Sequence, residues 1–162
     1  MNEHNYKQLI EEEHKKIEKL QGKILDQVFV HSLSGRIFVV YLKLDNEFFM
    51  ISGQLGSEYL GIFERPEANE KIEERKGVKQ AKEDIILEFK PFSIFLGKKI
   101  VQIRMIGEAW NGHGFEFSFE GMFDKTMIIQ SLYAGDYDDS WLFDCMRLGI
   151  GTYFYDCGLS EK

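Results

Sequence analysis

Residues 115–120, with the sequence FEFSFE, alternate aromatic and polar side chains without an exception. Successive side chains of a β-strand point to opposite faces of its sheet. Phe115, Phe117 and Phe119 therefore fall on one face, while the two glutamates and the serine fall on the other. This pattern predicts a strand with a buried face of phenylalanine rings and a wet, acidic face. The chain must accordingly form a sheet that buries one side.

Further β-rich segments lie on both sides of this strand, and turn residues separate them. Asn111-Gly112 predicts a hairpin turn before FEFSFE, and the residues from Gly121 to Asp124 predict a turn after it. The other strands are expected at 23–33, 36–44, 47–52, 83–89, 98–110, 125–133 and 152–155. Because short turns separate the first three of these, we expect them to form an antiparallel meander.

The N-terminal segment, residues 1–22, is predicted to be helical from residue 3. Charged residues surround an apolar face with helical spacing, which consists of Tyr6, Leu9, Ile10, Ile17 and Leu20. Gly22 is a typical residue for the end of a helix. We expect this helix to cover part of one face of the sheet.

Residues 64–84 differ in composition from the rest of the chain, since 13 of the 21 are charged. This composition predicts a charged surface excursion between two β-rich halves. Pro66 suits the first turn of a short helix within it. The sequence as a whole therefore predicts one α+β domain spanning residues 1–162. Its antiparallel, twisted sheet should have about five to seven strands.

The net charge of −7 is unevenly distributed along the chain. Residues 101–162 contain ten acidic and four basic side chains, whereas the first hundred residues almost cancel. Proteins that bind nucleic acid need a basic surface for the phosphate backbone, so the sequence argues against a nucleic-acid partner. An acidic third of the chain suits a basic protein partner instead.

The first twenty residues contain no apolar run of signal-peptide length, and no stretch approaches the ~20 apolar residues of a membrane span. We therefore expect a cytoplasmic protein that has no membrane partner. Cys145 and Cys157 are expected to be reduced thiols in that compartment. They lie twelve residues apart with no CxxC motif, so no zinc site is predicted.

No catalytic or cofactor motif is present in the sequence. It has no GxSxG nucleophile elbow, no P-loop and no GxGxxG fingerprint. An acid/base pair of His31 and His113 is one alternative, although His113 should be exposed in the hairpin turn. A glycosidase-like pair of Glu116 and Glu120 would require a second layer over their face of the sheet. We predict no catalytic residue, no metal and no cofactor.

Residues 133–144, YAGDYDDSWLFD, contain four aspartates and four aromatic residues. Asp136, Asp138 and Ser140 have the spacing that opens an EF-hand loop. The required glycine is replaced by Trp141 and the required glutamate by Arg147, so a calcium loop is not predicted.

Three alternatives remain for this acidic segment. It can be a turn in which Asp139 or Ser140 caps a helix at 139–148. It can hold a divalent metal together with other parts of the chain. It can also be a contact surface, because tyrosine and tryptophan anchor interfaces and carboxylates pair with basic residues across them.

In overall character, the acidic segment and FEFSFE included, the chain resembles the immunity proteins of bacterial polymorphic and contact-dependent toxin systems. The resemblance implies a small domain that neutralises a basic toxin by covering or flanking its active site. The predicted contact surface then consists of Asp136, Tyr137, Asp138, Asp139, Trp141, Glu116 and Glu120. The alternatives are a small-molecule-binding or enzymatic domain with an aromatic-lined pocket, and a structural protein without a discrete site.

Overall fold

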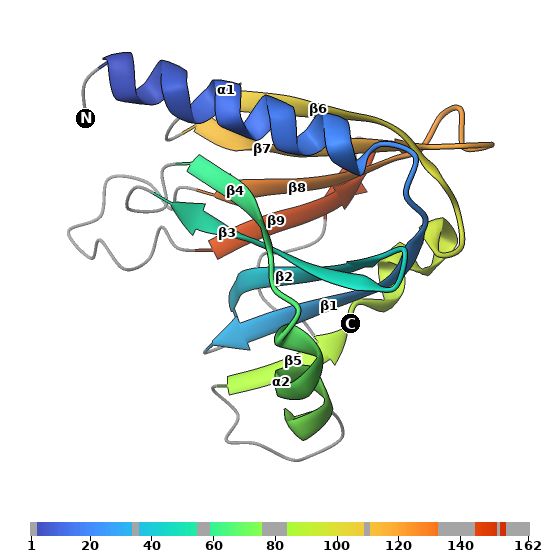
Figure 1. The fold of residues 1–162 in the computed structure, drawn as a ribbon. Helices are drawn as coiled ribbons and strands as arrows, with labels where there is room; N and C mark the ends of the chain where they lie inside the picture. The colour runs from blue at the N-terminus through green and yellow to red at the C-terminus, as the bar shows by residue number, and fades with distance from the viewer. Residues whose placement is uncertain are drawn as a thin grey trace.

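A computed structural model gives the fold of the chain (Figure 1). It describes residues 3–33, 36–54, 59–75, 84–108, 111–132, 145–151 and 153–154. Within these residues, ten strands form two antiparallel sheets of five strands each. The α+β single-domain prediction and the antiparallel pairing are confirmed, and the strands divide between two sheets rather than forming one.

The first sheet has the strand order β4-β3-β2-β1-β5. Its strands are β1 (Leu25–Leu33), β2 (Arg36–Leu44), β3 (Glu47–Gln54), β4 (Tyr59–Glu64) and β5 (Asp84–Glu88). The predicted meander of the first three strands is confirmed by the β1–β2 and β2–β3 pairings. Asp45 and Asn46 form the tight turn between β2 and β3, and both have positive φ angles of 48° and 68°.

The second sheet has the order β10-β9-β8-β7-β6, so each strand pairs with its neighbour in sequence. Its strands are β6 (Ile100–Glu108), β7 (Asn111–Phe119), β8 (Thr126–Leu132), β9 (Cys145–Ile150) and β10 (Tyr153–Phe154). FEFSF is the second half of β7, and the turn predicted from Gly121 to Asp124 joins β7 to β8.

The two sheets pack face to face around one hydrophobic core. Phe115 and Phe117 are fully buried and Phe119 is 2% exposed, which confirms the predicted aromatic face of this strand. The rings of Phe95 and Phe119 stack with their centroids 4.9 Å apart. Residues of the opposite parity, such as Glu116, lie on the outer face. The alternation seen in the sequence therefore sets which layer β7 belongs to.

Helix α1 (Glu3–Leu20) contacts β4, an edge strand of the first sheet, and β6, an edge strand of the second (Figure 1). Ile17 and Leu20 enter the central core from this helix. Gly22 has a φ of 93° and donates its backbone N–H to the carbonyl of Ile100 at 2.7 Å. The predicted helix and its end at a glycine are thus confirmed, and the glycine turns the chain toward β1.

A second, smaller hydrophobic cluster lies on the outer face of the first sheet. Helix α2 (Ala68–Arg75) docks there by burying Ala68 and Ile72 against side chains of β1, β2, β3 and β5. A short helix after Pro66 is therefore confirmed. Its two apolar side chains are enough to dock it within an otherwise charged stretch.

Three elements differ from the sequence-based expectation. The helix expected at 139–148 is wrong for residues 145–148, which belong to β9, while residues 139–144 lie outside the described residues. Strand β4 and the 3₁₀ helix η1 (Lys90–Phe95) were not predicted. In β9, Met146 and Leu148 alternate inward around Arg147, which is strand periodicity. None of the helices in the described ranges combines the length and hydropathy that a membrane crossing needs.

Candidate functional site

The acidic segment at residues 133–144 lies outside the described residues, and with it Asp136, Tyr137, Asp138, Asp139 and Trp141. The strands on either side fix where it joins the fold. Leu132 at the end of β8 pairs with Cys145 at the start of β9. Gln130 pairs with Gly114 of β7, so the segment is attached at the end of the sheet where β7 begins.

Glu116, a predicted contact residue, is held by its own sheet. Its carboxylate accepts hydrogen bonds from the Arg104 guanidinium, including one from Nε at 3.0 Å, and from the Thr126 hydroxyl at 2.8 Å. Burial alone would raise the pKa of Glu116, but the hydrogen bonds and the charge of Arg104 hold this pKa below its usual value. The side chain is therefore a fixed anion with two intramolecular partners, one from β6 and one from β8.

Glu120, the other predicted contact residue on this strand, lies in the turn between β7 and β8. It is exposed, and its backbone N–H donates to the carbonyl of Lys99 at 2.9 Å. The attachment points of the acidic segment lie at the other end of β8, roughly 20 Å away for a strand of this length. The structure therefore does not bring Glu120 next to the ends of that segment.

Phe123 is a residue that the sequence-based reasoning missed. It lies in the same turn as Glu120 and is 99% exposed. The turn around it is well ordered by the Glu120 bond and by a bond from Met122 N–H to the carbonyl of Phe119 at 3.1 Å. A single phenylalanine among polar turn residues in GMFDK was the available signal.

His113 occupies a buried position in β7, which contradicts its predicted exposure in a hairpin turn. It is only 2% exposed, because β7 already begins at Asn111 and both Asn111 and Gly112 pair with Glu108 in a bulge. Its Nδ1 accepts the backbone N–H of Leu60 at 2.9 Å, and its ring meets Tyr59 edge-on.

Burial lowers the pKa of His113 from 6.5 to about 4. The ring is therefore neutral at pH 7, and its proton lies on Nε2 because Nδ1 is the acceptor. Within the described ranges, Nε2 is buried without a hydrogen-bond partner. A neutral ring with its acceptor nitrogen already bonded is poorly placed for proton transfer near neutral pH.

The alternative of an acid/base pair formed by His31 and His113 is not supported, because strand parity directs the two side chains to different clusters. His31 pairs with Val39 and Ile86, which belong to the outer cluster under α2, and its ring lies 4.5 Å from that of Phe38. His113 comes from the other sheet and shares the inward parity of Phe115. The backbone of the first sheet therefore separates the two rings.

No group of metal-binding side chains occurs in the part of the chain that the structure describes. Of the two cysteines, Cys145 begins β9 and Cys157 lies outside the described residues. The predicted absence of a zinc site thus remains a prediction.

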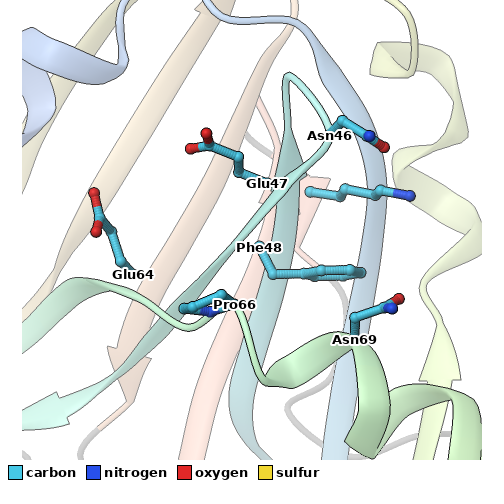
Figure 2. Close-up of a pocket in the computed structure, with 7 residues that line it drawn as sticks. Asn46, Glu47, Phe48, Glu64, Pro66 and Asn69 are labelled. Atoms are coloured by element: carbon cyan, nitrogen blue, oxygen red, sulfur yellow. The ribbon is translucent and has the colours of Figure 1, made fainter.

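A cavity of about 560 Å³ lies where the β2–β3 hairpin meets the start of α2 (Figure 2). It opens to the surface and lies away from both His31 and His113. Its lining residues are Lys43, Asn46, Glu47, Phe48, Glu64, Pro66 and Asn69. Among the described residues of this lining, Phe48 is the one aromatic side chain, and most of the others are charged or amide side chains, so the cavity differs from the aromatic-lined pocket expected for a small-molecule-binding domain.

No protein-family model matches this chain, no curated protein is found to be similar to it, and no solved structure matches its fold. The function is therefore inferred from the geometry of these surfaces.

Proposed function

We propose that this chain is a protein-binding module that captures and neutralises a basic protein partner, in the manner of the toxin-immunity proteins it resembles. The observation that carries the proposal is the nearly full exposure of Phe123 in the turn between β7 and β8. Glu120 and Asp124, both exposed, flank this ring. Aromatic anchors with charged neighbours are typical of the residues that dominate binding energy at protein interfaces.

The hairpin is suited to binding because its turn is attached to the core next to the exposed ring. Phe119, at the base of the turn, is buried in the core, and Met122 packs against that core. Gly121 adopts a φ of 82°, which lets the chain turn between these two residues. A fixed tip loses little conformational entropy when a partner covers it, so more of the contact energy appears as affinity.

The exposure of the whole Phe123 ring to water also favours binding, because a partner that covers the ring removes its apolar surface from water. Burying a side chain of this size contributes roughly 1.5–3 kcal/mol. The neighbouring carboxylates add charge complementarity to a basic surface, which speeds association and selects against acidic partners. The excess negative charge of residues 101–162 extends this complementarity beyond the turn.

The acidic segment at 133–144 provides the second part of the proposed contact surface. Its sequence combines aspartates with tyrosine and tryptophan, as the hairpin tip combines acidic residues with Phe123. The segment is joined to the fold at Leu132 and Cys145, at the other end of β8 from the hairpin tip.

The proposal is tested by capturing partners from the native cell with the tagged chain and measuring the affinity of the purified pair by calorimetry. We expect Phe123→Ser to weaken binding roughly tenfold or more. Charge reversal by Glu120→Lys with Asp124→Lys should slow association, and Asp136→Lys with Asp138→Lys and Asp139→Lys should abolish capture.

Ile94→Ser is the matched control, because Ile94 is a 41% exposed apolar residue on η1, outside both parts of the proposed surface. The proposal fails if the captured partner is acidic. It also fails if the hairpin and aspartate variants bind the partner as tightly as Ile94→Ser does.

A further inference from the structure

The cavity in Figure 2 lies on the first sheet and has a separate set of functional groups from the hairpin tip. Its volume of about 560 Å³ is in the range of small-molecule sites. The hairpin β2–β3 forms one wall and the start of α2 forms the other. Both walls are fixed, since Ala68 and Ile72 dock α2 on the sheet.

The basic and acidic residues that line this cavity lie on opposite faces of the first sheet, as the strand pairing shows. Lys43 pairs with Phe48, and both lie on the outer face of the sheet that α2 covers. Glu64 pairs with Phe49, which points into the central core, and Glu47 has the same parity as Phe49. Figure 2 shows the carboxylates of Glu47 and Glu64 on the opposite side of β3 from Phe48. The two acidic groups therefore lie on one face of the sheet and the lysine on the other.

Lys43 supplies a cation to the lining of the cavity. Its Nζ lies 5.5 Å from the centre of the Phe48 ring, which holds the ammonium through a cation–π contact. Within the described ranges, no carboxylate lies at ion-pair distance from Lys43.

Two side-chain amides face the same space. Asn46 is held in its turn by its backbone N–H, which donates to the carboxylate of Asp26 at 2.7 Å. Asn69 lies in the first turn of α2, next to the buried Ala68. Both amides line the cavity and are exposed, so each can offer a donor and an acceptor to a bound molecule.

We propose that this cavity binds a small organic monocarboxylate. The carboxylate meets the Lys43 ammonium and an amide donor, and the body of the ligand lies against Phe48 and Pro66. Charge-assisted hydrogen bonds of this kind are stronger than neutral ones. Glu47 and Glu64, which line the cavity from the other face of the sheet, repel a second negative charge, and this repulsion selects a monoanion over phosphate or a dicarboxylate.

The test uses the full chain labelled with ¹⁵N, titrated with benzoate and followed by two-dimensional NMR. We expect saturable shifts of the backbone amides of Phe48 and Asn69 and of the side-chain amides of Asn46 and Asn69. Benzamide, which has the same shape without the charge, should bind at least tenfold more weakly, and inorganic phosphate should leave these signals in place. Lys43→Met should weaken benzoate binding about tenfold or more, and Lys43→Arg should retain most of it.

Lys71→Met is the control, since it removes an exposed lysine of α2 that does not line the cavity. A well-dispersed spectrum of each variant shows that it is folded. The proposal is overturned if benzoate causes no saturable shift at these residues, or if benzamide binds equally well. Equal effects of Lys43→Met and Lys71→Met overturn the role of Lys43, and binding of phosphate at the same residues overturns the selection for a monocarboxylate.

Discussion

The Nδ1 atom of His113 accepts the backbone N–H of Leu60 at 2.9 Å, so that a side chain of one sheet caps the edge strand of the other. A second cap follows two residues along the same strand, where the carboxylate of Glu13 accepts the N–H of Ile62 at 3.2 Å. Unpaired backbone groups on an edge strand invite pairing with another chain. Together, His113 and helix α1 satisfy two donors on the free edge of β4 and cover it.

The first prediction concerns the dependence of stability on pH. Because burial lowers the pKa of His113 to about 4, the unfolded chain binds the proton more readily between pH 6.5 and pH 4. Stability should therefore be complete above about pH 6.5 and should fall as the pH decreases, with a total loss on the order of 3 kcal/mol at pH 4. Urea denaturation of the chain at a series of pH values measures this loss.

His113→Asn is the informative variant for that series, since its Oδ1 can replace Nδ1 as the acceptor without titrating. It should be less stable than the native chain at pH 8 but should vary much less between pH 6.5 and 4. Below about pH 4.5 both proteins should lose stability, because the folded chain holds the pKa of Glu116 low and the unfolded chain does not. An unchanged slope between pH 6.5 and 4 would assign this titration to another group.

The second prediction concerns the cap on Ile62. Glu13 is 1% exposed, and its other oxygen accepts from Lys16 Nζ at 2.7 Å. Glu13→Ala removes the acceptor and should cost about 1–3 kcal/mol of unfolding free energy, whereas Glu13→Gln keeps an oxygen for Ile62 and should cost less. Glu12→Ala, at an exposed position of the same helix, is the control. Equal stabilities of the two alanine variants in urea would show that the cap contributes nothing.

Much of the fold was predictable because most strands have one buried face and one solvent-exposed face. Such strands alternate apolar and polar residues, and this alternation can be detected in the sequence. The alternation of Phe115, Phe117 and Phe119 with polar residues located β7 and its inward face directly. Strand β4 carried no such pattern, since Tyr59 to Ile62 are all buried. A strand without alternating burial has no period of two to detect. The two caps on β4 are also long-range contacts. Leu60 and His113 are 53 positions apart in the sequence, and Ile62 and Glu13 are 49 positions apart, so local patterns cannot show either contact.

The candidate surfaces were less predictable for a related reason. The alternation in the sequence predicted that Glu120 is exposed to solvent. Nothing in the sequence indicated that Phe123, in the same turn, is almost fully exposed. Asn111-Gly112 indicated a turn, yet the glycine forms a bulge inside β7, and His113 is buried as a result. Lys43 and Asn69 come together only because α2 docks on the first sheet, a tertiary contact made by Ala68 and Ile72.

The third prediction concerns Gly114, where β7 and β8 approach closely. A Cβ atom at this position would lie 2.0 Å from the carbonyl oxygen of Ile129 and 2.6 Å from the Cα of Gln130. Gly114→Ala must therefore push the strands apart and should cost roughly 3 kcal/mol or more. Gly97→Ala meets no atom within 4 Å but has a φ of 81°, so it should cost only about 1–2 kcal/mol. Thermal unfolding that ranks the two variants in the reverse order would contradict this packing.

The fourth prediction separates binding from stability at Phe123. The ring is 99% exposed, so Phe123→Ser removes almost no packing and should change the unfolding free energy by no more than about 0.5 kcal/mol. Phe117→Ala, at a fully buried position of β7, should lower the unfolding free energy by about 3–5 kcal/mol. Urea denaturation of both variants measures the two changes. If Phe123→Ser destabilised the chain by several kcal/mol, the ring would be part of the core, and a lost partner could then be explained by unfolding. If the variant is as stable as the native chain, any loss of the partner measures the contact made by this side chain.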